Sequence, residues 1–236
     1  MDPPPAGIVH PLARRWVPRA TCTLLGTFVA VYVAELVVAA MPTWVAAHGN
    51  RMPLLEYLFV VNTDWPYRPW SLVTATLAHN PSGIDHILLN GLFLFFFGPA
   101  VERLLGWRRF VALFFLAGAL SGIAQVHLEA YATSGNLRDW RVDGGSLGAS
   151  GGLMALMGLL VVLTPNQRIG IMGIIPAPLW VAGLLYAALD IAGVVDSYVG
   201  PGIGHFAHLS GMALGLLAGW WVKRDWQRRG LHLVYG

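Results

Sequence analysis

Ser150 lies among small residues in a setting that suits a nucleophile. The five residues from Gly148 to Gly152 read Gly-Ala-Ser-Gly-Gly. Glycines on both sides let a substrate or another backbone approach the hydroxyl closely. The serine also begins an apolar run, and the free backbone N–H groups at the start of a helix can hold a developing negative charge. This setting predicts acyl-transfer chemistry, provided that a base lies nearby.

His208 is the candidate base. It lies in a later apolar run that contains a series of glycines at about four-residue spacing, Gly204, Gly211, Gly215 and Gly219. Small residues at this spacing let two membrane helices pack closely, and Gly151 and Gly158 of the serine's run are the obvious partner. We therefore expect Ser150 and His208 to meet as nucleophile and base. His205, one turn earlier, is the alternative base if the helix is shifted in register.

His86 and Asn90 lie four residues apart, on one face of a third apolar run. Both side chains can donate hydrogen bonds to a carbonyl oxygen as it becomes negative. The alternative is a structural network of hydrogen bonds at the start of a helix. His79 is interpreted as structural, joining the preceding loop to this run.

The elements that must position these residues are apolar runs suited to a membrane. The chain has 236 residues, 56% hydrophobic and 11% charged, with a mean hydropathy of +0.60. Soluble domains carry about 25% charged residues, so the composition excludes a soluble globule, and it is too apolar for a disordered chain. Six apolar runs indicate an all-α bundle of six transmembrane helices: 20–40, 84–105, 110–126, 147–163, 171–195 and 203–222.

The basic residues predict the orientation. With the N-terminus inside, eleven of the 15 Lys and Arg residues fall in cytoplasmic segments and four fall outside. We expect residues 1–19 to be a cytoplasmic tail, 20–222 the membrane domain and 223–236 a second cytoplasmic tail. The first outer loop is long and aromatic, which favours short amphipathic helices at the membrane surface. In this topology Ser150, His208, His86 and Asn90 share one layer, within about 10 Å of the outer surface.

The sequence resembles the rhomboid family of intramembrane serine proteases. Three motifs carry the resemblance: His86-Ile-Leu-Leu-Asn90, Gly148-Ala149-Ser150-Gly151, and Ala207-His208-Leu209-Ser210-Gly211 followed by Gly215. The resemblance implies Ser150 as nucleophile and His208 as general base, in a dyad with no acid. It implies an oxyanion site formed by His86, Asn90 and the backbone N–H of Ser150, with Gly148, Ala149, Gly151 and Gly211 in support. It also implies a cofactor-free endopeptidase that cleaves single-span membrane proteins near the outer membrane face.

Three positions depart from the family pattern. Met154 replaces the tyrosine that commonly lies against the catalytic histidine, although a thioether can still pack on an imidazole. The first outer loop reads Arg68-Pro69-Trp70-Ser71 where the family has a Trp-Arg pair, and Glu102-Arg103-Leu104 follows the second run in place of Glu-x-Arg.

Other functions fit the sequence less well. A non-catalytic rhomboid-like protein that binds transmembrane helices is the main alternative, but such relatives typically lack the serine or the histidine. A transporter needs polar groups along a path through the membrane, and the cytoplasmic halves of the runs have almost none. No HExxH or Cys/His spacing indicates a metal site, and the scattered basic residues form no stripe for nucleic acid. We expect a multi-pass protein of a prokaryotic cell membrane.

Further expectations concern charges inside the first and fifth runs and the prolines of the fifth. Glu35 and Asp190 are charges inside apolar runs and are expected to make hydrogen bonds between helices. Pro176 and Pro178 are expected to weaken the inner end of the fifth helix, and the turn at 200–202 to act as a hinge. That helix would be the movable wall through which a substrate enters, with Trp180 and Leu184 facing the second helix.

Overall fold

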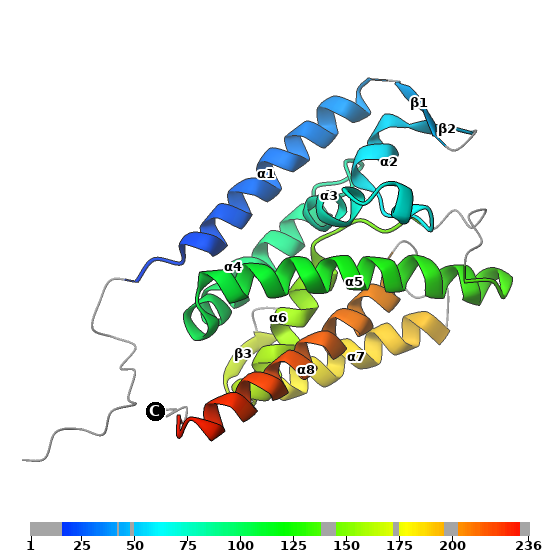
Figure 1. Cartoon of the computed structure of the whole chain (residues 1–236). Helices are drawn as coiled ribbons and strands as arrows, with labels where there is room; N and C mark the ends of the chain where they lie inside the picture. Colours follow the sequence, from blue (N-terminus) through cyan, green and yellow to red (C-terminus); the bar gives the residue numbers. More distant parts are fainter. Residues whose placement is uncertain are drawn as a thin grey trace, which may run out of the picture.

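The fold is a bundle of helices in the order of the predicted runs. The computed structural model describes residues 16–41, 43–47, 50–137, 145–171, 175–195 and 203–231, so the expected hinge at 200–202 lies outside the described residues, as do Arg138 and Arg141. The six longest helices are α1 (Arg19–Ala39), α4 (Asp85–Leu105), α5 (Trp107–Ser134), α6 (Ser150–Leu163), α7 (Leu179–Val195) and α8 (His205–Arg228) (Figure 1).

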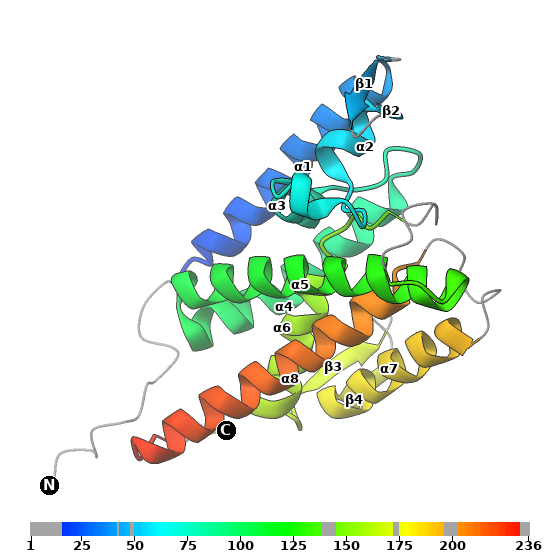
Figure 2. The ribbon, with the colours of Figure 1, turned by 45° about the vertical axis from the view of Figure 1, so that its right-hand side comes forward.

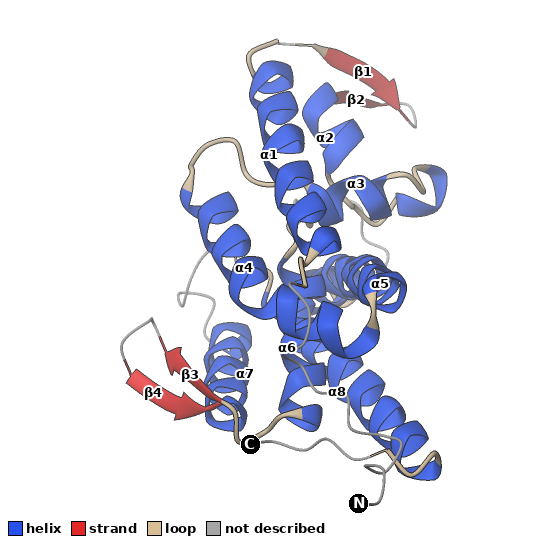
Figure 3. Ribbon diagram, turned by 90° about the vertical axis from the view of Figure 1, so that its left-hand side faces the viewer, coloured by secondary structure: helices blue, strands red, loops and turns tan. Residues whose placement is uncertain are grey.

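Helix α6 forms the centre of the bundle. It packs against α4, α5, α7 and α8, whereas α1 lies at the edge against α4 (Figure 3). All ten residues from Gly151 to Leu160 are buried. A helix that is apolar all round belongs in the interior of a bundle, which explains why this short run takes the central place.

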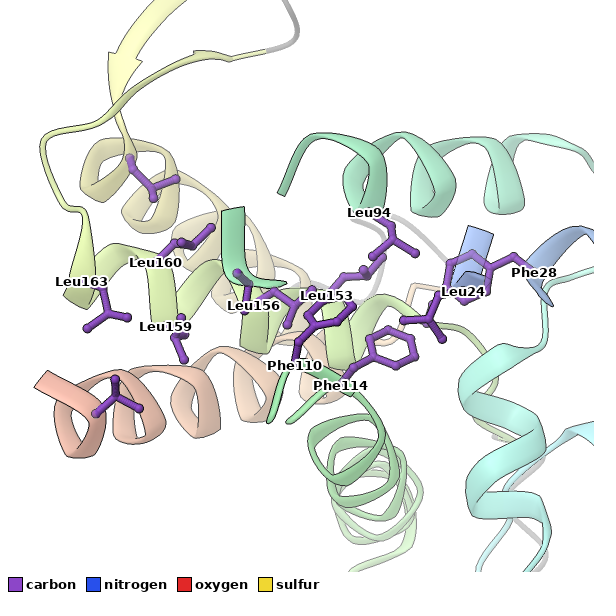
Figure 4. Close-up of a cluster of buried hydrophobic side chains, with 14 residues drawn as sticks. Leu24, Phe28, Leu94, Phe110, Phe114, Leu153, Leu156, Leu159, Leu160 and Leu163 are labelled. Atoms are coloured by element: carbon purple, nitrogen blue, oxygen red, sulfur yellow. The ribbon is translucent and has the colours of Figure 1, made fainter. Parts of the chain in front are cut away.

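The hydrophobic core joins α6 to the other five long helices, mainly to α1, α4 and α5. Figure 4 shows leucines of α6 meeting Leu24 and Phe28 of α1, Leu94 of α4, and the rings of Phe110 and Phe114 of α5. Phe28, Leu94, Phe110 and Phe114 are at most 1% exposed. The core therefore fixes α6, whose first residue is Ser150, relative to α1, α4 and α5.

The lengths of the helices confirm a helical membrane fold. Helices α1, α4 and α5 are each long and apolar enough to cross a bilayer. Helices α6 and α7 are apolar but shorter, with 14 and 17 residues. At 1.5 Å per residue they measure roughly 21 and 26 Å, less than the hydrocarbon core of about 30 Å. The count of six spans stays a prediction.

The basic ends of several helices lie at one end of the molecule. The start of α1, the turn between α4 and α5, and the end of α8 lie toward the left in Figures 1 and 2. These segments carry Arg19, Arg103, Arg108, Arg109, Lys223, Arg224 and Arg228. The structure thus gathers these basic residues at one end of the bundle, and the assignment of that end to the cytoplasm stays a prediction.

The fifth run differs from the expectation. Arg168–Ile171 (β3) and Ile175–Pro178 (β4) form an antiparallel hairpin beside α7, and α7 begins only at Leu179 (Figure 3). Pro176 and Pro178 therefore lie in a strand, and the expectation that they weaken a helix is wrong. The physical reason is that proline lacks an N–H and disfavours helical conformation in the residue before it. The helix forms directly after the second proline.

One other expectation is corrected. Trp180 and Leu184 are 44% and 63% exposed, so they do not close a contact with the second span. Helix α8 continues past Val222 to Arg228, because residues 223–229 contain no glycine or proline. The end of the membrane domain at Val222 stays a prediction.

The long loop between α1 and α4, which the sequence predicts to be the first outer loop, contains regular structure in its described residues. It contains a hairpin of Trp44–Ala47 (β1) and Asn50–Pro53 (β2), the short helices Leu54–Phe59 (α2) and Ser71–Leu77 (α3), and a 3-10 turn at Trp65–Tyr67 (η1). The short helices agree with the sequence analysis, whereas the hairpin was not expected. Arg68 organises this loop from its interior.

The Arg68 side chain is 1% exposed and is fully engaged. Its guanidinium donates to the carbonyl oxygens of Glu56, Tyr57 and Val60 and forms an ion pair with Asp64. The planar fork of arginine suits such a set of acceptors. The rearranged Arg68-Pro69-Trp70-Ser71 motif therefore still supplies a buried arginine to this loop.

Glu102, of the Glu102-Arg103-Leu104 motif that departs from the family pattern, connects two helices. Its carboxylate accepts hydrogen bonds from the backbone N–H groups of Ala20 and Thr21 and from the Thr21 hydroxyl. These N–H groups belong to the first turn of α1, which has no internal acceptors for them. Glu102 therefore joins the end of α4 to the start of α1.

Candidate active site

Ser150 is the first residue of α6, and its side chain is half-buried. The first hydrogen bond of the helix runs from the N–H of Leu153 to the carbonyl of Ala149. The N–H groups of Ser150, Gly151 and Gly152 therefore precede the regular hydrogen bonds of the helix and have no acceptor within it. Such groups form a region of positive potential beside the serine hydroxyl.

Gly148 lies in the turn before Ser150, and the ring of His86 packs against it. Its φ is +128°, a conformation that favours glycine. A Cβ on Gly148 would lie 2.9 Å from Nε2 of His86 and 3.8 Å from Oγ of Ser150, so a larger residue would disturb the imidazole. The sequence motif thus has a local reason: glycine is needed for the turn and for the approach of His86.

Helices α6 and α8 touch through their backbones. A Cβ on Gly211 would overlap the carbonyl of Gly151, and one on Gly215 would overlap the carbonyl of Ala155. A Cβ on Gly219 would lie 2.9 Å from the carbonyl oxygen of Leu159. The expected packing of the two glycine series is confirmed, and it brings the starts of α6 and α8 together.

The start of α8 is also held by α5. The N–H of Ala207 donates to Oε1 of Gln125 at 2.9 Å, which satisfies one of the free donors at the start of the helix. His208 is the fourth residue of α8, and its side chain is 20% exposed. The candidate base therefore lies in the first turn of a helix that touches the serine's helix.

A carboxylate lies against His208. Nδ1 of His208 is 3.0 Å from Oδ1 of Asp190 in α7, and Nδ1 of His205 is 2.9 Å from the same oxygen. The dyad of Ser150 and His208 with no acid stays a prediction, and the structure adds a carboxylate beside its histidine. The hydrogen bonds expected of Asp190 between helices are confirmed, but their partner was not foreseen, because it depends on how α7 packs on α8.

The two histidines differ in what their rings face. A Cβ on Gly193 of α7 would overlap the ring of His205, so this imidazole fills a notch in α7. His208 lies close enough to His86 for the two groups to interact electrostatically. His208, the base expected from the sequence, therefore lies near His86, whose ring borders the turn before Ser150.

The tautomer of the neutral His86 ring is defined by a hydrogen bond. Its Nδ1 accepts a hydrogen bond from the backbone N–H of Asn80 at 3.1 Å, so the neutral ring carries its proton on Nε2. Nε2 is the atom that lies beside Gly148. Asn90 is 6% exposed, and its amide donates to the carbonyl oxygen of His86 at 2.9 Å. The structure thus brings His86 to the serine's turn and directs one Asn90 hydrogen bond along α4.

His79 lies behind His86. Its backbone N–H donates to both carboxylate oxygens of Glu35 in α1, at 3.0 and 2.9 Å. Its ring packs between Phe28 and the edge of His86. Burial, with a smaller contribution from His86, lowers the pKa of His79 to about 4. This residue joins α1 to α4 as a neutral imidazole.

Met154 is buried one turn below Ser150. It forms an apolar cluster with Met157 and Met212, and Ala187 of α7 packs against that cluster. Among the described residues, no three His, Cys, Asp or Glu side chains are placed to hold a metal ion. The expectation that the protein needs no metal stays a prediction.

The comparisons with known proteins all point to one family. A Rhomboid domain matches residues 66–225. The chain is 30% identical over 174 residues to YdcA, a rhomboid protein of Bacillus subtilis, covering 73% of this chain and 74% of the relative. It is 27% identical over 208 residues to the rhomboid protease GlpG of Yersinia pestis, covering 87% and 63%. Rhomboid protein 1 of Saccharomyces cerevisiae, a mitochondrial protein, is 27% identical, and the chain spans 56% of its length.

Proposed function

The chain belongs to the rhomboid family, and we propose that it is a serine endopeptidase that cleaves transmembrane-anchored proteins near the outer membrane face. The observation that carries the proposal is the meeting of three helix starts. His86 of α4 and Ser150 of α6 lie at the same glycine, and α8 touches α6 one turn from His208. These are the residue types that acyl transfer needs.

In the proposed reaction the Ser150 hydroxyl attacks the carbonyl carbon of the scissile bond. Nε2 of His208 takes the hydroxyl proton and then delivers it to the leaving amine, so that an acyl-enzyme remains on Ser150. Water, activated by the same nitrogen, hydrolyses the ester and regenerates the serine. His208 thus serves as base in the first half of the reaction and as acid when the amine leaves.

The oxyanion that forms during attack needs fixed donors. Nε2–H of His86 and the backbone N–H of Ser150 are proposed for this role, with the Asn90 amide in support. Donors that are already oriented stabilise the transition state without reorganisation, which is the largest single term in many enzymes. The hydrogen bond from Asn80 supports this assignment because it fixes which nitrogen of His86 donates.

The substrates proposed are single-span membrane proteins, and we propose six spans with both termini in the cytoplasm. The protein is an integral, multi-pass membrane protein. A prokaryotic cell membrane is our proposal for its location, and relatives occur in bacteria and in mitochondria.

A reporter that is active only in the cytoplasm, fused after Gly236, tests the proposed orientation. A silent fusion alongside a working positive control would contradict it.

The activity is tested with the full chain in proteoliposomes and a single-span reporter substrate. Wild type is expected to cleave it, whereas Ser150→Ala and His208→Ala each reduce cleavage to background. The double variant should be no worse than either single variant, because nucleophile and base act as a unit. Ser134→Ala, at the end of α5, is the matched control and should cleave normally. A wild-type protein that binds the substrate without cleaving it would support the non-catalytic alternative.

A further inference from the structure

Asp190 is a buried carboxylate whose two described hydrogen bonds both involve histidines. Its side chain is 7% exposed, inside an otherwise apolar helix. Oδ1 of Asp190 lies within hydrogen-bond distance of Nδ1 of His205 and of Nδ1 of His208, which both belong to the first turn of α8. A buried carboxylate is costly unless it is hydrogen-bonded, so these contacts account for how Asp190 is tolerated at this position.

The contact determines the state of the His208 ring. An ionised carboxylate only accepts hydrogen bonds, so with Asp190 ionised Nδ1 of His208 carries the proton of this contact. In the neutral imidazole, Nε2 is then the basic nitrogen. This is the tautomer that can take a proton from Ser150, and the opposite tautomer has no lone pair available at Nε2.

We propose that Asp190 is a positioning residue of the active site, acting through His208. It holds the imidazole in the basic tautomer and in one orientation, and it stabilises the imidazolium that forms when Ser150 attacks. The inference rests on the proposed function of Ser150 and His208, and it adds a third residue to the pair that the sequence indicates. Asp190 itself touches neither the substrate nor the reacting atoms.

His205 shares the task of fixing the carboxylate. Its ring fills the notch at Gly193, three residues from Asp190 on the same face of α7. This packing keeps the two helices in register, so that Oδ1 stays opposite Nδ1 of His208. The titratable groups that face His208 are thus Asp190 from α7, His205 from its own helix and His86 from α4.

The competing interpretation is purely structural, with Asp190 doing no more than tying α7 to α8. Asp190→Asn separates the two. Asparagine has the same shape, but its amide can donate to Nδ1 and so place the histidine proton on Nε2. Positioning through His208 predicts that kcat falls at least about 100-fold while KM stays within about 3-fold, since the substrate contacts are untouched. Asp190→Glu should recover part of the lost kcat.

The matched control is Asp225→Asn, which removes a carboxylate from the far end of α8 where it pairs with Arg229. It should leave kcat unchanged. The thermal midpoint of every variant is measured in the same detergent. A structural tie predicts a lower midpoint for Asp190→Asn with a normal kcat per folded molecule, and that result would overturn the proposal.

A second measurement decides the matter even if the variant folds poorly. Nitrogen NMR of wild-type protein labelled with ¹⁵N-histidine reports the tautomer of each ring, with His208→Gln used to assign its signals. We expect His208 to be protonated at Nδ1, and a neutral ring protonated at Nε2 would refute the proposal. Failure of the proposed function is distinct: the wild-type protein itself would then be inactive. An active wild type with normal Asp190→Asn turnover rejects only the role of Asp190.

Discussion

The backbone N–H of Asn80 donates a hydrogen bond to Nδ1 of His86 across the turn that joins α3 to α4. The bond leaves Nε2 as the protonated nitrogen, and this atom faces the turn at Gly148 that leads into Ser150. The backbone of a loop residue, Asn80, thus determines which nitrogen of His86 can donate a hydrogen bond beside Ser150. The relation makes the role of His86 testable apart from that of the serine.

His86→Ala is expected to lower kcat by roughly 10²–10³, the usual cost of one oxyanion donor, with little change in KM. The interaction strengthens only as charge develops, so it contributes to the transition state and not to substrate binding. Asn90→Ala should have a smaller effect, because the hydrogen bond seen for its amide goes to the His86 carbonyl. Steady-state kinetics check both. A raised KM with unchanged kcat would show that His86 is structural.

The contact between α6 and α8 predicts a large difference between two identical substitutions. Gly215→Ala places a Cβ against the carbonyl of Ala155, whereas Gly26→Ala in α1 meets no atom within 4 Å. Gly215→Ala should destabilise the protein by about 1–3 kcal/mol, as overpacking does, and lower its activity. Gly26→Ala should be neutral or slightly stabilising. Thermal midpoints and cleavage rates measure the pair, and equal behaviour would contradict the close packing of α6 and α8.

Arg68 should be needed for the first outer loop. Arg68→Lys retains the charge but loses the fork that reaches three carbonyl oxygens and Asp64. We expect a loss of about 2–3 kcal/mol of stability from these charge-assisted hydrogen bonds. The control is Arg51→Lys, at an exposed position in β2. If both variants melt at the wild-type temperature, Arg68 does not organise the loop.

The buried imidazole of His79 predicts a dependence of stability on pH. Its pKa is about 4 in the folded protein, against about 6.5 in an unfolded chain. Between these values the unfolded state binds more protons, so stability falls as the pH is lowered from about 6.5 toward 4, by at most about 1.4 kcal/mol per unit. The neighbouring titratable groups are Glu35 from α1 and His86 from α4.

Thermal midpoints measured between pH 7 and pH 5 test this effect. Relative to His79→Phe, whose ring can fill the same space beside Phe28, the wild-type midpoint should become lower as the pH falls over that range. An equal change in both proteins would assign the pH dependence to other groups.

The helices and the close approach of α6 to α8 were predictable from the sequence because they depend on local signals, whereas the catalytic roles of the site residues stay predictions. Runs of apolar residues located the six long helices, and the glycines beside Ser150 and around His208 predicted close packing between α6 and α8. The β3–β4 hairpin was missed because its residues continue the apolar run that leads to α7, and only Pro176 and Pro178 signalled an interruption.

The contact of Asp190 with His208 could not be read in the same way. The two residues are 18 positions apart on different helices, and their meeting depends on the rotation of α7 against α8. Glu102 presents the same problem, since its partner Thr21 lies 81 residues away. Asp190 stood out in the sequence as a charge inside an apolar run, which indicated that it needs a partner but not which one, whereas Glu102 stood out only as part of a departing motif.

The central claim is that Ser150 is an activated nucleophile. It is tested most directly by exposing the detergent-purified protein to a fluorophosphonate probe and locating the adduct by mass spectrometry. We predict an adduct on Ser150 in the wild-type protein and none in folded His208→Ala, because the hydroxyl reacts only when a base accepts its proton. Two results would contradict the claim: a folded wild-type protein in which Ser150 stays unmodified, or a Ser150→Ala variant that is labelled as well as the wild type.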